Sequence, residues 1–183
     1  GFAWQGEYFP PRKKARGTPS SDLPPTKFVT FLQNHDQIGN RPLGERLITL
    51  SNPDAFQAAY ALLLLCPMTP MLFLGEEWGS TTPFYFFSDF HGEIGKKVIL
   101  GREEQFAEYC NLTDPEILKT LPNPIDPKTF RLSKPDRSQR DSPAGQAWLA
   151  MTRELLSLRH SKITPYLKGA YSAGADILGN KAV

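Results

Sequence analysis

Cysteine is scarce in this sequence, because Cys66 and Cys110 are the only two among 183 residues. Cys66 closes an apolar run and Cys110 lies in a polar segment, so the pair has neither the spacing of a disulfide framework nor that of a metal site. We therefore expect two free thiols and no bound metal.

A long uninterrupted apolar run is also missing. A membrane-spanning helix needs roughly 18 to 20 such residues, whereas the longest run here, residues 58–68, is shorter and already contains Pro67. Nothing at the start of the sequence resembles the charged segment and apolar core of a secretory signal. These absences favour a soluble, cytoplasmic protein with no membrane partner.

Positive and negative side chains are nearly equal in number, with 21 Lys and Arg against 19 Asp and Glu. The net charge of +2 is too small to indicate a nucleic-acid partner. One short segment is locally basic and contains Arg12, Lys13, Lys14 and Arg16. Because prolines and a glycine surround it, we interpret it as a solvated loop, with a polyanion-binding module as the alternative.

The first third of the sequence predicts a loop followed by a strand. Residues 1–26 are rich in proline, serine and basic residues, which is typical of a long loop. The aromatic and β-branched run 27–33 predicts a buried strand, and the apolar run 71–74 predicts a second one.

A helix is expected between these two strands. Asn52 is placed to cap it, Pro53 suits its first turn, and it should continue to about Cys66. Its residues are apolar on nearly all sides from Ala58 onward, which predicts packing on more than one face. A strand, a helix and a strand in this order make the two strands parallel, so an α/β fold with helices covering a parallel sheet is expected.

The second half is less regular. Residues 75–141 contain many turn formers and only two helical fragments, 102–110 and 115–120. An amphipathic helix is predicted from Pro143 onward. The final residues, 166–183, have the pattern of the start of a β-domain.

Polar side chains follow both predicted strands. The first cluster is Asn34-His35-Asp36 and the second is residues 75–78. Ligands of parallel α/β folds bind at the carboxyl ends of the strands, so both clusters are candidates for a binding site. A turn stabilised by its own Asn and Asp side chains is the structural alternative. More hydrogen-bonding side chains follow the first cluster than one turn requires, namely Gln37, Asn40 and Arg41.

Three segments carry a resemblance to a known family: FVTFLQNHDQIGNRPLGERL, MTPMLFLGEEWGSTTPFYFFSDF and EIGKKVILGREEQF. They resemble the malto-oligosyltrehalose trehalohydrolases, which are members of the α-amylase superfamily, glycoside hydrolase family 13. The segment QGEYFPPRKKARG resembles the loop that precedes them there. Asn-His-Asp alone is specific only to the superfamily, whereas QNHDQIGNR together with GEEWGSTTPFYFFSD is specific to the trehalohydrolases.

The resemblance implies a fold and an activity. Residues 1–165 would be the C-terminal part of a TIM (β/α)8 barrel, including a long loop region at 75–141, and residues 166–183 would begin a C-terminal β-domain. The implied reaction is hydrolysis, with retention and without a cofactor, of the α-1,4 bond next to the terminal trehalose of malto-oligosyltrehalose.

The resemblance also implies roles for individual residues. Asp36 would stabilise the transition state, assisted by His35 at the same glucose unit. Six further residues would bind the substrate: Asn34, Gln37, Arg41, Tyr8, Phe9 and Glu77. Packing of Tyr8 and Phe9 in a core or lid is an equal alternative, and Glu76 and Glu77 are expected to support the floor of the pocket. An aromatic cluster is expected to pack under the long loop: Trp78, Phe84, Phe86 and Phe87.

A retaining glycosidase needs a nucleophile and a general acid in addition. In the family both precede the segment that Gly1 begins, so these 183 residues alone are expected to be inactive. Two other readings stay open, a glycogen branching enzyme-like glucanotransferase and a non-catalytic carbohydrate-binding remnant.

Overall fold

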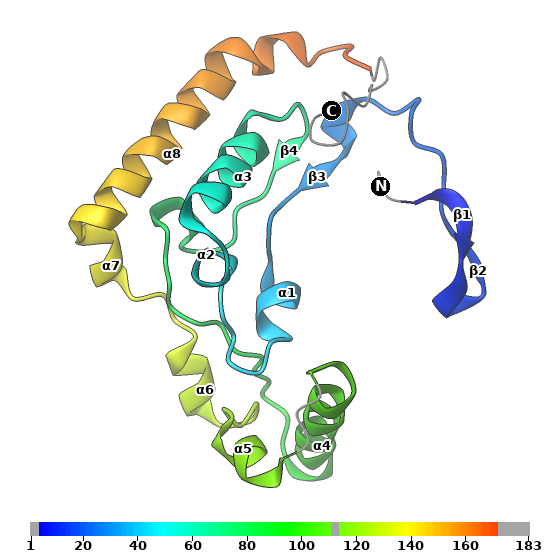
Figure 1. Ribbon diagram of the computed structural model, residues 1–183, viewed down its shortest axis with the longest axis vertical. Coiled ribbons are helices and arrows are strands. Elements are labelled where there is room, and N and C mark those ends of the chain that lie inside the picture. The colour runs from blue at the N-terminus through cyan, green and yellow to red at the C-terminus, as the bar shows by residue number, and fades with distance from the viewer. Residues whose placement is uncertain (1–3, 111–113, 172–183) are drawn as a thin grey trace. The chain divides into compact units, whose positions relative to one another are not determined.

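A computed structural model describes residues 4–110 and 114–171 (Figure 1). These residues belong to two compact units, one made of residues up to 30, 62–71 and 155 onward, the other of residues 31–61 and 72–154. Within the described ranges, no helix combines the length and the apolar character needed to cross a bilayer. The predicted β-domain falls mainly on residues 172–183, which lie outside the described residues.

The first unit begins with an antiparallel hairpin. Its strands are β1, Gln5–Phe9, and β2, Lys14–Gly17, joined by the 3₁₀ turn η1, Pro10–Arg12. Lys13 closes this turn with a left-handed backbone, at a φ of 49°. The prediction of a loop for these residues was therefore wrong, because both prolines fall in the turn and remove no hydrogen bond from either strand.

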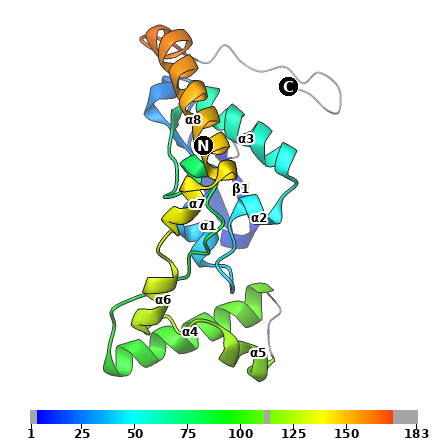
Figure 2. The same cartoon turned by 90° about the vertical axis from the view of Figure 1, so that its left-hand side faces the viewer.

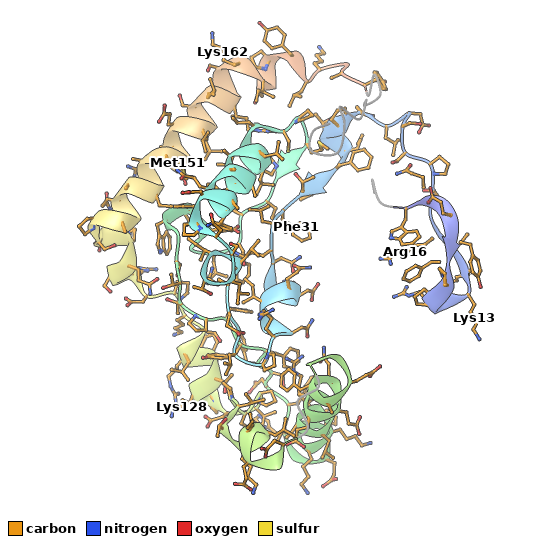
Figure 3. The ribbon with its side chains drawn as sticks, in the orientation of Figure 1. Lys13, Arg16, Phe31, Lys128, Met151 and Lys162 are labelled. Carbon is orange, nitrogen blue, oxygen red and sulfur yellow. The ribbon has the colours of Figure 1, made fainter. Side chains whose placement is uncertain are left out.

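Two aromatic rings lie beside Arg16 of this hairpin, which Figure 3 labels. The Arg16 guanidinium lies 4.6 Å from the centre of the Phe9 ring and 5.5 Å from that of Trp4. The two rings meet edge to face with centres 4.8 Å apart. The side chains of β2 are all exposed, so the alternation that would have revealed a half-buried strand is absent.

The same unit contains a short parallel pair. Strand β3, Val29–Thr30, follows the 3₁₀ turn η2, Pro25–Lys27, and pairs with β4, Thr69–Pro70. The expected parallel pairing is confirmed, but both strands are shorter than expected, and the second pairs before residue 71 rather than at 71–74. The backbone amides of Thr69 and Met71 donate to the carbonyls of Phe28 and Thr30, so Pro70 occupies the position that needs no N–H.

Helix α3, Pro53–Leu65, connects the paired strands as expected. The Asn52 side chain accepts from the amides of Asp54 and Ala55, at 3.0 and 3.2 Å, which confirms the predicted cap. Four of its side chains are buried, Phe56, Tyr60, Leu63 and Leu64, whereas Leu62 is 71% exposed, so the expected packing on more than one side stays a prediction. Cys66, just beyond the helix, is a free thiol, while the side chain of Cys110 lies outside the described residues.

Helix α8, Pro143–Lys162, begins at the predicted Ser-Pro pair, where the Ser142 hydroxyl accepts from the amide of Gly145. Near its end Arg159 binds the chain that leaves α3. The guanidinium donates to the carbonyl oxygens of Leu64, Cys66 and Met68, at 3.0 Å for Leu64 and 2.7 Å for Met68. One positive side chain thus satisfies the Leu64 carbonyl at the end of α3 and two carbonyls of the chain that follows it.

Replacing Arg159 by Ala is expected to lower the free energy of unfolding by about 2 kcal/mol, because three carbonyls lose a charged donor together. Chemical denaturation of the full-length protein measures the loss. Arg153→Ala is the matched control, since Arg153 lies on the same helix and is exposed. Equal losses in the two variants would contradict the capping role.

In the second unit, α3 and α8 lie side by side (Figure 1) and share an aromatic core. The Trp148 ring stacks on Phe56 at 5.6 Å and contacts Tyr60 at 5.4 Å. Tyr60 is completely buried, and its hydroxyl lies 3.1 Å from the Thr152 hydroxyl. Burial is the main cause that raises the pKa of Tyr60 to about 12.

This pKa predicts a pH-dependent stability. Because the folded pKa of about 12 exceeds the ordinary tyrosine pKa of 10.0, the contribution of Tyr60 is complete below pH 10 and is lost as pH rises through 12. Wild-type protein should be about 1 kcal/mol more stable than Tyr60→Phe below pH 10, through the bond to Thr152. Denaturation curves between pH 8 and roughly 12 should show this advantage shrinking; a constant difference would contradict it.

The segment expected to be a long connection carries four helices. They are α4, Gly92–Cys110; α5, Pro115–Thr120; α6, Pro127–Leu132; and α7, Arg137–Asp141. Figure 2 shows α4, α5 and α6 lying together. Asp114, Asp126 and Asp136 each cap the helix that follows by accepting from the amide two residues on. Helix α5 has its predicted bounds, whereas α4 begins at Gly92 and not at the predicted residue 102. Helices α6 and α7 have only 6 and 5 residues, too few for an apolar periodicity, and were not predicted.

Candidate functional site

After β3, residues 31–34 lead into a short helix. This helix, α1, is His35–Gly39, and Asn34 is its N-cap. The Asn34 side chain accepts from the amide of Asp36 at 2.7 Å, and the Gln37 side chain accepts from the amide of Asn34 at 2.9 Å. The two amide oxygens are thus used for capping, and each side chain keeps its NH2 group as a donor for a ligand.

Asp36 and His35 lie in the first turn of α1 with their side chains open to solvent. The Asp36 side chain is 67% exposed and that of His35 is 69% exposed, and the His35 Nε2 lies 3.5 Å from the Asp36 Oδ1. The structure therefore brings a carboxylate, an imidazole and the capping amides together on one turn. Such groups can donate to and accept from the hydroxyls of a sugar.

The second cluster begins at Gly75, whose left-handed backbone, with a φ of 84°, starts the 3₁₀ turn η3, Glu76–Trp78. Glu76 turns inward and is only 2% exposed. Its carboxylate accepts from the Gln33 side chain and from the Phe73 amide, both at 2.8 Å. The bond from Gln33 joins the residues that follow β3 to those that follow β4.

A buried arginine lies near this carboxylate. Arg46 has no exposed surface, and its guanidinium donates to the carbonyls of Leu74, at 2.8 Å, and Thr82, at 2.5 Å, while it lies over the Phe73 ring. Burial raises the pKa of Glu76, against the bonds from Phe73 and Gln33 and the charge of Arg46. Burial likewise lowers the pKa of Arg46, which the charges of Glu76 and Glu77 partly offset.

Glu77 and Arg41 are engaged in ordinary contacts. Glu77 is half-buried, and its backbone carbonyl accepts from the Thr152 hydroxyl at 3.0 Å. Arg41 forms an ion pair with Glu45, with the Arg41 Nε 3.2 Å from a carboxylate oxygen. Both side chains lie in the same unit as Asp36.

Tyr8 and Phe9 lie on the hairpin of the other unit. Tyr8 is exposed, and Phe9 packs with Trp4 and Arg16. The Phe9 ring is thus in contact with Trp4 and Arg16 and the Tyr8 side chain is exposed, and for both residues the choice between substrate binding and packing stays a prediction.

The expected aromatic cluster under the long segment packs in part. Phe73, Phe84, Phe87 and Phe130 form a chain of edge-to-face contacts with ring centres 5.0–5.7 Å apart. Phe86 lies instead under the Arg102 guanidinium, at 4.8 Å, and Arg102 also donates to the Gly39 carbonyl and the Asn40 side chain. Arg102 thereby ties α4 to the end of α1.

Sequence reasoning missed Gln33, Arg46 and Arg102. A polar residue at the end of an apolar run was a usable signal for Gln33. Arg46 and Arg102 lie in ordinary polar stretches, and their partners are up to 63 residues away along the chain, so the sequence contains no local signal for either role. Among the described residues, no cluster of three or more His, Cys, Asp or Glu side chains is arranged to hold a metal ion.

Comparisons with known proteins relate the chain to malto-oligosyltrehalose trehalohydrolases. It is 39% identical over 161 residues to a malto-oligosyltrehalose trehalohydrolase of Deinococcus radiodurans, covering 87% of this chain and 26% of that protein. It is 46% identical over 116 residues to the trehalohydrolase of Saccharolobus solfataricus, covering 63% of this chain and 20% of that protein.

A solved structure gives a consistent result. The crystal structure of a candidate alpha amylase from Salmonella typhimurium is 43% identical and superposes with a TM-score of 0.86, covering 98% of this chain and 30% of that chain. No protein-family model matches. The chain thus has the α/β fold of this type of glycosidase, and it spans about a quarter of the length of the curated relatives it matches.

Proposed function

We propose that this chain, a relative of the malto-oligosyltrehalose trehalohydrolases, forms part of the glucan site of a hydrolase that releases trehalose from malto-oligosyltrehalose. The bond cleaved would be the α-1,4 bond next to the terminal trehalose unit. The observation that carries the proposal is the placement of Asp36 and His35 on one exposed turn after β3, joined through Gln33 to the turn after β4. Ligands of parallel α/β folds bind where strands end in this way.

Asp36 would act on the transition state. Glycoside cleavage passes through an oxocarbenium-like state in which the ring carbon gains positive charge. A carboxylate that binds the sugar hydroxyls more tightly in that state lowers the barrier. His35 would donate to the same glucose unit, and the NH2 groups of Asn34 and Gln37 would supply further hydrogen bonds.

Three more side chains would bind other glucose units. Arg41 and Glu77 offer charged groups for hydroxyls, and the exposed Tyr8 ring offers an apolar face for a sugar ring. For Phe9, which is half-buried beside Arg16, we retain the same role.

The larger architecture is part of the same proposal. Residues 1–165 would contribute the last strands and helices of a TIM barrel, and residues 166–183 would begin a β-domain. The nucleophile and the general acid would come from other parts of the protein. The product would serve trehalose synthesis in the cytoplasm, and the reaction would need no cofactor.

An assay of the full-length protein tests the proposal. Incubation with malto-oligosyltrehalose should release trehalose and a maltodextrin, which chromatography separates. Amylose converted to products with new α-1,6 branches, without trehalose release, would indicate a glucanotransferase instead. Cleavage of internal bonds in maltodextrins without trehalose release would favour an amylase, the activity that the Salmonella typhimurium relative suggests.

A further inference from the structure

Gln33 is the only described residue whose side chain joins the segments after both strands to the start of α2, Leu47–Leu50. Its Oε1 accepts from the Leu47 amide and its Nε2 donates to a Glu76 carboxylate oxygen, each at 2.8 Å. Both side chains of this pair are 2% exposed. Water therefore competes little for either bond.

The chemistry of the partners fixes the orientation of the amide. The Leu47 N–H can only donate, so it must face the amide oxygen of Gln33. The NH2 group then points to Glu76, whose other carboxylate oxygen accepts from Phe73. Every donor in this set meets an acceptor, and rotation of the amide by 180° would break both bonds of Gln33.

We propose that Gln33 is a positioning residue for hydrolysis, which holds the Asn34–Asp36 turn in the geometry that binds the reacting glucose. The inference rests on the proposed function. Asn34 follows Gln33 directly, and its cap sets the position of the Asp36 backbone. A movement of Gln33 therefore moves Asn34, to which it is covalently bonded. Through the hydrogen bond from the Asp36 amide to the Asn34 side chain, it also moves the Asp36 carboxylate.

The Gln33–Glu76 pair differs from a polar contact that only fills the core. A core contact affects stability, whereas a positioning contact also affects the turnover of molecules that are folded. A misplacement of about 1 Å costs on the order of 10²-fold in rate when the geometry of a reacting group depends on it. The two roles can therefore be separated by measuring kcat and folding together.

Two single substitutions break the pair and their combination restores it. In Gln33→Glu two buried carboxylates face each other. In Glu76→Gln the new side chain has one oxygen and one NH2 group, so its NH2 group must face another donor, either the Gln33 NH2 or the Phe73 N–H. In the double variant the Gln at 76 donates to the Glu at 33 and accepts from Phe73, while the Glu at 33 accepts from Leu47. The bonds from Leu47 and Phe73 and the bond between residues 33 and 76 are all formed again, with the negative charge at position 33 instead of position 76.

The experiment measures kcat and KM for trehalose release from malto-oligosyltrehalose, with full-length wild-type protein and the three variants. Circular dichroism at the assay temperature gives the folded fraction. We expect each single variant to lose on the order of 10²-fold in kcat per folded molecule, with a smaller change in KM, and the double variant to recover at least tenfold of that loss. The loss in Gln33→Glu should grow as pH rises, because two facing carboxylates can share a proton only at low pH.

The outcomes separate the two proposals. A wild-type protein that releases no trehalose overturns the proposed function and this inference with it. An active wild type combined with an unchanged kcat in folded Gln33→Glu overturns the inference alone, as does a double variant no better than the single ones. If Gln33→Glu does not fold, the double variant is the test. The inference requires that it folds and releases trehalose, and failure of either overturns the inference. Gln57→Glu and Glu104→Gln make the same changes at exposed positions and control for added or removed charge.

Discussion

Asp36→Asn should lower kcat for trehalose release by about 10²- to 10³-fold, because the amide keeps the shape of the side chain but not its charge. The carboxylate is expected to act mainly on the transition state, where positive charge develops on the sugar ring. KM should therefore change much less than kcat. Steady-state kinetics of the full-length protein measures both constants.

The fold should tolerate this substitution. The Asp36 side chain is largely exposed, and the cap of α1 uses the backbone amide of Asp36 rather than its carboxylate. Thermal unfolding should place the midpoint of the variant close to that of the wild type. A large loss of stability would mean that the carboxylate supports the turn, and the loss of activity could not then be assigned to chemistry.

Asp54→Asn is a closely matched control. Asp54 lies two residues after the cap Asn52, just as Asp36 lies two residues after Asn34, and in both cases the cap accepts from the Asp amide. The same change is thus made at the same position of another helix. If both variants lost activity equally, or if neither did, the assignment of Asp36 to the reacting subsite would be wrong.

Arg46→Ala should lower the free energy of unfolding by about 3–5 kcal/mol, since removal of one partner from a buried charged network leaves the others unpaired. The carbonyls of Leu74 and Thr82 would lose their donor, and the buried Glu76 would lose a nearby positive charge. The Phe73 ring would also lose the group that covers it. Chemical denaturation of the full-length protein measures the change.

Two variants make this result specific. Arg137→Ala removes an exposed guanidinium from α7 and should change stability by less than about 0.5 kcal/mol. Arg46→Lys keeps the charge but cannot donate to both carbonyls from separate nitrogens, so its loss should lie between those of the two alanine variants. A loss below about 1 kcal/mol in Arg46→Ala would show that the network contributes little.

The sequence alone was sufficient where the signal is local. Asn52 and Pro53 mark the start of α3, and Ser142 and Pro143 mark that of α8, because a cap and a proline act on the amides of the next turn. The parallel pairing of β3 and β4 followed from the helix between them. Asn34-His35-Asp36 was predicted to come directly after the first of these strands, whereas the paired strand ends at Thr30.

The sequence was insufficient where partners are distant or where neighbouring residues are alike. Glu76 and Glu77 are adjacent and identical, and the choice of Glu76 for burial depends on Gln33, Phe73 and Arg46, which surround it only after folding. The hairpin was missed because its strands are exposed, so burial leaves no alternation in the sequence. Local composition specifies which turn a residue can form, whereas the burial of a polar side chain depends on donors and acceptors that tertiary packing brings to it from far along the chain.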